Sequence, residues 1–179
     1  SATSLVNFGS LISKIFAIPW LTFISPNSMS IASGSVSNLV LNTGNSGTTA
    51  RLLCSAIIDS EYPIKITGDN SLKKRDMRRI IRPLKLFGAK FKEGNGRLPI
   101  LIKGSKFTKP INYIENLGSA QCKSAVMIAA LKTKGVTKIK SLISRNHTEL
   151  MFKNVLNIPI RLNHKKNYDY IEVQGKNEI

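Results

Sequence analysis

The most informative stretch is Gly44-Asn45-Ser46-Gly47-Thr48-Thr49-Ala50-Arg51-Leu52-Leu53, in which glycine and small polar residues lead into an apolar run. The apolar positions that follow fit one face of a helix: Leu52, Leu53, Ala56 and Ile57. The first turn of such a helix has free N–H groups that can hold an anion. The helix dipole contributes about 0.3–1 kcal/mol, whereas a charge-assisted hydrogen bond contributes about 1.5–3 kcal/mol, so arginines such as Arg51 should dominate any tight site. Taken alone, the pattern favours an ordinary helix cap, and it lacks the Gly-Lys-Ser/Thr of a P-loop.

Three further segments have the same character. Gly68-Asp69-Asn70-Ser71-Leu72-Lys73-Lys74-Arg75 follows a strand-like run at residues 64–67. Leu117-Gly118-Ser119-Ala120-Gln121-Cys122-Lys123-Ser124-Ala125 opens a second apolar helix, and Ser144-Arg145-Asn146-His147-Thr148-Glu149 opens a third. Together the four motifs resemble the EPSP synthase (3-phosphoshikimate 1-carboxyvinyltransferase) family of enolpyruvyl transferases, from Asn42 to about Ile179. The loop cysteine motif of the sister family that acts on UDP-N-acetylglucosamine is absent from the sequence.

The chain also repeats itself. A helix end, a left-handed stop and a strand recur at residues 5–12, 84–91 and 155–160, with Gly9, Gly88 and Asn157 as the stops. Such periodicity predicts stacked units of the order strand, helix, strand, helix, strand, strand. We expect an α/β (α+β) fold and one partial domain: a remnant of a first repeat at residues 1–40, a second repeat at 41–110 and a third at 111–179. The resemblance implies that these units surround inward-packed helices.

The resemblance also implies the ligand-binding residues. Phosphoenolpyruvate is expected at Asn45, Gly47, Thr48, Arg75 and Gln121. Shikimate 3-phosphate is expected at Ser119, Ala120, Gln121, Ser144 and Arg145. His147 and Arg51 are supporting residues, and Arg51 could be either a structural anchor or a direct ligand. The helix starts near Thr48, Arg75, Gln121 and Arg145 should open on one shared cleft, because stacked repeats place equivalent turns at the same end of a domain.

Several residues carry more than one interpretation. A methyl group at Gly47 would crowd a ligand and could strain a positive φ. Asp76 stands where the family usually has proline, so it could cap a helix or pair with Arg75. Lys123 is expected to be a neighbouring charge only, and Pro83 is expected to kink or interrupt its helix.

The activity implied by the resemblance is transfer of the carboxyvinyl group of phosphoenolpyruvate to shikimate 3-phosphate, with release of phosphate, in aromatic amino acid biosynthesis. That reaction needs acid and base groups besides anion binding. The family's N-terminal Lys-Ser…His-Arg motif and its second domain, which bring those groups, are not found in this sequence. The chain begins with Ser, so we expect a fragment or processed product, inactive alone, whose partner is the missing second domain.

The formal net charge of +17 suggests an alternative, a stand-alone basic module that binds anionic ligands or nucleic acid. The densest basic run, residues 73–85, interleaves with aliphatic side chains and has no aromatic residues for base stacking. We therefore expect small-molecule substrates and no nucleic acid. Selective binding of shikimate 3-phosphate would distinguish the enzyme from a module with steeply salt-dependent binding to any polyanion.

The remaining composition predicts a cytoplasmic protein without a cofactor. The two cysteines do not form a disulfide framework, and together with two separated histidines they lack metal-ligand spacing. The apolar run at residues 15–24 is interrupted by Pro19 and is shorter than the roughly 20 residues of a membrane span, so no membrane association is expected.

Overall fold

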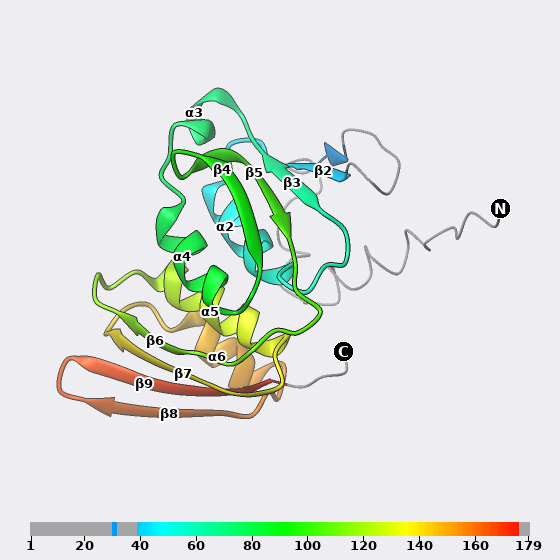
Figure 1. The fold of residues 1–179 in the computed structure, drawn as a ribbon. Coiled ribbons are helices and arrows are strands. Elements are labelled where there is room, and N and C mark those ends of the chain that lie inside the picture. The colour runs from blue at the N-terminus through cyan, green and yellow to red at the C-terminus, as the bar shows by residue number, and fades with distance from the viewer. Residues whose placement is uncertain (1–29, 32–38, 176–179) are drawn as a thin grey trace.

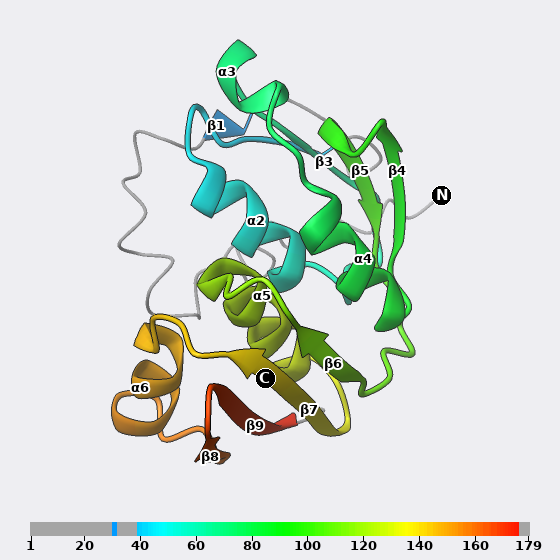
Figure 2. The same ribbon diagram turned by 90° about the vertical axis from the view of Figure 1, so that its left-hand side faces the viewer.

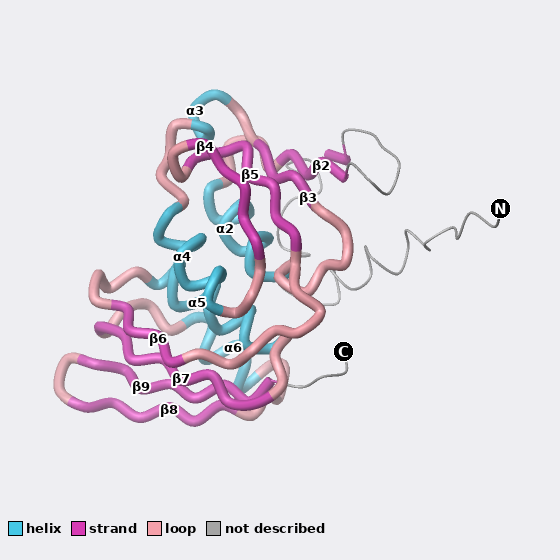
Figure 3. The backbone as a smooth tube through the Cα atoms, viewed as in Figure 1, coloured by secondary structure: helices cyan, strands magenta, loops and turns pink. Residues whose placement is uncertain are grey.

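The structure, a computed structural model, describes residues 30–31 and 39–175. The expected first repeat therefore lies almost entirely outside the described residues, including the helix end and glycine stop at residues 5–12. The described chain forms two sheets that enclose a layer of helices (Figures 1 and 3).

The first sheet has the strand order β1-β2-β3-β5-β4. Its strands are β1 (Ser30–Ile31), β2 (Leu39–Asn42), β3 (Ile64–Thr67), β4 (Lys90–Gly94) and β5 (Arg97–Lys103). β2 and β3 run parallel, with Leu39 opposite Ile64, and the other neighbours run antiparallel. A parallel pair needs a crossover between its strands, and α2 (Gly47–Ala56) supplies it.

The second sheet repeats this arrangement in the order β6-β7-β9-β8. Its strands are β6 (Asn112–Glu115), β7 (Gly135–Leu142), β8 (Ile160–Lys165) and β9 (Tyr168–Gly175). β6 and β7 are parallel and are connected by α5 (Ala120–Leu131), whereas β7–β9 and β8–β9 are antiparallel. The strand-helix-strand-helix-strand-strand order is therefore confirmed for both sheets, while the exact repeat boundaries at residues 41 and 111 stay predictions.

The core lies between the sheets. α2 and α5 pack against each other in the interior, and α4 (Arg78–Leu86) packs against both of them (Figures 1 and 2). From Ala125 to Leu131 every residue of α5 is buried, which matches its continuous apolar sequence. α3 (Asn70–Lys73) is a single turn, and α6 (His147–Asn154) is the second helix of the second unit.

The expected interruption of the helix at Pro83 is wrong, because α4 runs through this residue from Arg78 to Leu86. The alternative, that Pro83 kinks the helix, stays a prediction. Proline removes the hydrogen bond to the carbonyl of Arg79, an exposed residue, and an interior proline costs about 3 kcal/mol. Ile80, Ile81 and Leu84 are nearly fully buried on the same helix, and each contributes about 1.5–3 kcal/mol. Packing of the apolar face thus outweighs the local preference.

The two stops within the described residues are confirmed. Gly88 follows α4 with φ +108°, and Asn157 follows α6 with φ +50°. Both are left-handed conformations, which glycine and asparagine adopt most readily. Among the described helices, none is both long and apolar enough to cross a membrane.

Candidate active site

The turn before α2 is a capped helix start. Gly44 has φ +55°, and the Ser46 side chain accepts a hydrogen bond from the Thr49 N–H at 3.2 Å. Gly47, the first residue of the helix, does not have a positive φ, so the strain considered from the sequence is absent there. A methyl group at Gly47 would instead lie 3.0 Å from Arg51 Nη1 and 3.2 Å from Arg75 Nη1. The glycine therefore leaves room for two guanidinium groups beside the helix start.

Arg75 does not begin a helix, as the sequence suggested, but lies between α3 and α4. The short helix α3 closes at Lys73, and α4 begins only at Arg78. Arg75 Nη2 donates to Asn45 Oδ1 at 3.2 Å, and Asn45 Nδ2 donates to Asp69 Oδ2 at 2.7 Å. Asn45 thus holds Arg75 beside the start of α2 rather than at the start of another helix.

Asp76 pairs with Arg78 and not with Arg75. Asp76 Oδ1 accepts the Arg78 N–H at 2.7 Å, and Asp76 Oδ2 lies 2.8 Å from Arg78 Nη2. The hydrogen bonds from Arg78 lower the pKa of Asp76 to about 2, so this carboxylate is ionised at neutral pH. Among the described residues, Arg75 has no ion pair with a carboxylate, and its guanidinium remains available to an anion.

Gln121 connects the two inner helices. Its Oε1 accepts a hydrogen bond from Arg51 Nη1 at 2.9 Å, and its Nε2 donates to Thr48 Oγ1 at 2.8 Å. Arg51 therefore acts as an anchor for Gln121 while it also flanks Gly47. The helix starts of α2 and α5 meet at this amide.

The start of α5 is fixed by two side chains. Ser119 caps the helix, and its oxygen accepts the Cys122 N–H at 3.3 Å. Glu115 is buried and accepts the N–H groups of Leu117 and Ser119, the latter at 3.0 Å. These bonds fix the turn that presents Ser119 and Ala120 at the start of the helix.

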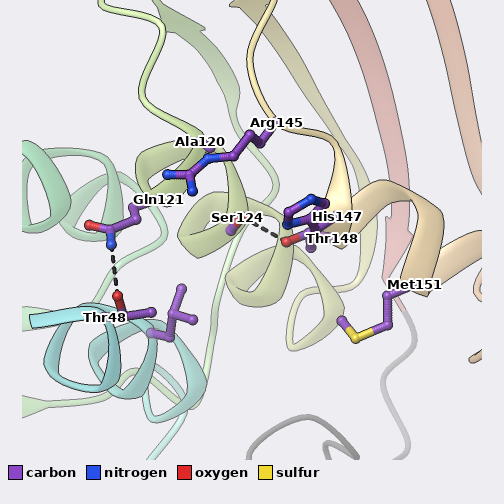
Figure 4. A pocket seen from close by; sticks show the side chains of 9 residues that line it. Thr48, Ala120, Gln121, Ser124, Arg145, His147, Thr148 and Met151 are labelled. Atoms are coloured by element: carbon purple, nitrogen blue, oxygen red, sulfur yellow. Dashed lines mark hydrogen bonds between the residues drawn. The ribbon is translucent and has the colours of Figure 1, made fainter. Parts of the chain in front are cut away.

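A pocket of about 390 Å³ lies between the starts of α2, α5 and α6 (Figure 4). The side chain of Arg145 points toward the side of the pocket formed by Ala120 and Gln121 (Figure 4). Of the residues predicted to bind or support ligands, five line this pocket: Thr48, Ala120, Gln121, Arg145 and His147.

The other predicted residues lie outside the lining of this pocket: Asn45, Gly47, Arg51, Arg75, Ser119 and Ser144. The expected shared cleft therefore holds for Thr48, Gln121 and Arg145, whereas Arg75 lies next to it, across Gly47. The oxygen of Ser144 is buried and has no hydrogen-bond partner among the described residues.

Four residues of the lining were not predicted from the sequence: Leu52, Ser124, Thr148 and Met151. Ser124 and Thr148 share a hydrogen bond of 2.7 Å, which joins α5 to α6 (Figure 4). Ser124 lies three positions after Gln121 and thus on the same helix face, a spacing that could have identified it.

The two cysteines are buried thiols whose surroundings do not favour the reactive thiolate. Burial raises the pKa of Cys54 to about 12 and also raises the pKa of Cys122. Within the described residues, no group of three His, Cys, Asp or Glu side chains is placed to hold a metal ion.

The sequence of residues 22–179 matches the family described as EPSP synthase (3-phosphoshikimate 1-carboxyvinyltransferase). The chain belongs to the EPSP synthase family. A relative from Caldicellulosiruptor saccharolyticus, named 3-phosphoshikimate 1-carboxyvinyltransferase, is 49% identical over 123 residues, which are 67% of this chain and 28% of the relative. Another from Endomicrobium trichonymphae is 46% identical over 111 residues, which are 62% of this chain and 26% of the relative.

The fold agrees with solved members of the EPSP synthase family. A 2.37 Å structure of EPSP synthase from Acinetobacter baumannii superposes with a TM-score of 0.67 and 34% identity, over 80% of this chain and 31% of that one. A second structure of the enzyme from the same organism superposes with a TM-score of 0.66 and 33% identity, over 80% of this chain and 32% of that one. The chain thus spans only about a quarter to a third of the length of the relatives it matches.

Proposed function

We propose that this chain supplies the part of an enzyme that binds phosphoenolpyruvate and shikimate 3-phosphate. The enzyme transfers the carboxyvinyl group from phosphoenolpyruvate to shikimate 3-phosphate and releases phosphate. The observation that carries the proposal is the meeting of the α2 and α5 starts at Gln121, with Arg51, Arg75 and Arg145 around them. Membership in the EPSP synthase family supports the choice of substrates.

The two ligands are assigned to neighbouring regions. Phosphoenolpyruvate is placed beside Gly47, where Arg51 and Arg75 approach and Asn45 holds Arg75. Both guanidinium groups suit a phosphate, which accepts bidentate charge-assisted hydrogen bonds. Thr48 and Gln121 lie between this region and the pocket.

Shikimate 3-phosphate is placed in the pocket between α5 and α6. Its phosphate would meet Ser119 and Ala120 at the start of α5, together with the side chains of Ser144 and Arg145. The helix end favours an anion by about 0.3–1 kcal/mol, and the arginine supplies the stronger interaction. Gln121 would contact both ligands.

The acid and base groups of the reaction are proposed to come from a second domain, which is also the proposed partner of this chain. Protonation of the methylene carbon and deprotonation of the substrate hydroxyl require such groups near the ligands. The residues of the pocket other than His147 are neutral or permanently cationic. The contribution of this chain is binding and neutralisation of charge.

The test is a titration of the isotope-labelled chain with shikimate 3-phosphate, followed by backbone amide shifts. Saturable shifts at Ser119–Gln121 and Ser144–His147 that persist in 0.2 M salt would support the proposal. A titration with single-stranded DNA provides the comparison, because nucleic-acid binding of a +17 chain should weaken steeply with salt. Shifts produced by DNA alone would favour the basic binding module instead.

A further inference from the structure

A buried charge cluster includes Lys123 and Glu149, the sequence neighbours of the pocket-lining Ser124 and Thr148. The Lys123 side chain is completely buried in α5, and its Nζ lies 2.6 Å from Glu149 Oε1 and 3.4 Å from Asp169 Oδ2. Glu149 belongs to α6 and Asp169 to β9, and both are nearly as buried as the lysine. The sequence suggested only a neighbouring charge at Lys123, whereas the structure makes it the centre of an internal ion-pair cluster.

Lys123 is the group that offsets the charge of Glu149. Apart from Lys123, the Glu149 carboxylate has no partner among the described residues, so the short ion pair is its main compensation. Asp169 is also contacted by His164, whose Nδ1 lies 2.6 Å from Oδ1 at the exposed edge of the sheet. A buried charge that loses its partner is strongly unfavourable, so the separation of α5 and α6 is constrained by this pair.

The position of the pair along both helices relates it to the ligand-binding residues. Lys123 follows Gln121 by two residues, and Glu149 follows His147 by two residues. Neither Lys123 nor Glu149 lines the pocket, so neither would touch a ligand there. The Ser124–Thr148 hydrogen bond joins the same two turns on the pocket side.

We propose that Lys123 is a positioning residue, which holds the first turn of α6 against the first turn of α5 so that Arg145 and Gln121 face the same ligand. The proposal rests on the proposed function for the identity of the ligand, and it concerns residues that do not bind that ligand themselves. Loss of the ion pair should therefore weaken shikimate 3-phosphate binding and leave the region beside Gly47 intact.

The test compares Lys123→Met with the double variant Lys123→Met/Glu149→Gln. The single variant leaves Glu149 buried and unpaired, so it could fail to fold. The double variant removes both charges of this pair, keeps similar side-chain volumes and leaves Asp169 its contact with His164, so it should stay folded. Lys132→Met is the matched control, because Lys132 lies at the other end of α5 and pairs with Asp59 at 3.9 Å.

Two readouts are measured for each variant: the dissociation constants of shikimate 3-phosphate and phosphoenolpyruvate, and amide hydrogen exchange in the first turn of α6. In the double variant we expect exchange at residues 147–150 to accelerate at least tenfold and shikimate 3-phosphate to bind at least tenfold more weakly. Phosphoenolpyruvate affinity should change less than twofold, and Lys132→Met should match the wild type in both measurements.

The outcomes separate this proposal from the proposed function. A folded double variant with wild-type exchange in α6 would overturn the positioning role, whatever its affinity. Equal losses of affinity for both ligands would also overturn the positioning role, because a general loss of structure would weaken the binding of both ligands alike. If the wild-type chain bound no shikimate 3-phosphate, the proposed function would fail, and the exchange comparison would still decide the positioning role.

Discussion

The substitution Gly47→Ala should weaken phosphoenolpyruvate binding without destabilising the fold. The added methyl group would lie 3.0 Å from Arg51 Nη1 and 3.2 Å from Arg75 Nη1, whereas an ordinary contact begins near 3.4 Å. The two guanidinium groups must therefore retreat by about 0.4 Å and about 0.2 Å. Both atoms are ends of flexible side chains, so the helix itself need not move.

The expected magnitude follows from the hydrogen bonds that this retreat disturbs. A charge-assisted hydrogen bond contributes about 1.5–3 kcal/mol, and each 1.4 kcal/mol changes a dissociation constant tenfold. Loss of one such bond should raise the dissociation constant of phosphoenolpyruvate by about tenfold to a hundredfold. Alanine is the better helix former by up to about 1 kcal/mol, so the midpoint of urea unfolding should stay equal or rise.

The assay is calorimetric or NMR titration with phosphoenolpyruvate, beside urea unfolding of the same protein. Gly94→Ala is the matched control, because the residue lies in β4 and a methyl group there meets no atom within 4 Å, neither Arg51 nor Arg75 included. An unchanged dissociation constant in Gly47→Ala would refute the placement of phosphoenolpyruvate beside the two guanidinium groups. A large loss of stability would refute the claim that only flexible side chains must move.

Three further outcomes are expected. Gly68→Ala should lower the free energy of unfolding by about 1–3 kcal/mol, because its methyl group would lie 2.6 Å from Leu72 Cδ2 and 2.7 Å from the Gly44 carbonyl oxygen; an unchanged urea midpoint would argue against that packing. Cys54, whose pKa is raised to about 12 by burial, should stay protonated and unlabelled by a thiol reagent at pH 8, and labelling should rise only as the pH approaches 12 or the chain unfolds. Rapid labelling of the native protein would show that this thiol is accessible. The chain alone should release no phosphate from the two substrates, and turnover above a no-protein control that is lost in Arg75→Ala would contradict this expectation.

The fold was largely predictable because local signals and packing agree. Glycine and asparagine stops at Gly88 and Asn157 mark where each unit leaves its second helix, and both adopt the left-handed conformation. Small polar residues before apolar runs mark the starts of α2 and α5, where Ser46 and Ser119 act as caps. These are short-range features, so a single sequence carries them.

The predictions for Pro83 and Lys123 failed because contacts distant along the chain outweigh local preference, whereas the prediction for Arg75 failed because of a local contact. Pro83 stays within a helix because the apolar face of α4 is buried against the core. Arg75 was placed at a helix start, but Asp76 binds Arg78 and so favours a start beyond it. The partners of Lys123 are Glu149 and Asp169, and the latter is 46 residues away along the chain. A signal for Lys123 did exist, because a lysine in the first turn of a largely apolar helix must be paired once that helix is buried.

The position of the site follows from the packing of one unit on the next. A single unit supplies one capped helix start, which is a weak anion site on its own. Because α2 packs against α5, the start of each helix comes within reach of the other, and Gln121 accepts from Arg51 while it donates to Thr48. Arg75 lies between β3 and α4 of one unit, and Arg145 lies in the equivalent place of the next unit, between β7 and α6. The charges that the two proposed phosphate ligands require are therefore gathered only when the two units are stacked, so a variant that separates α2 from α5 should lose both proposed ligands together.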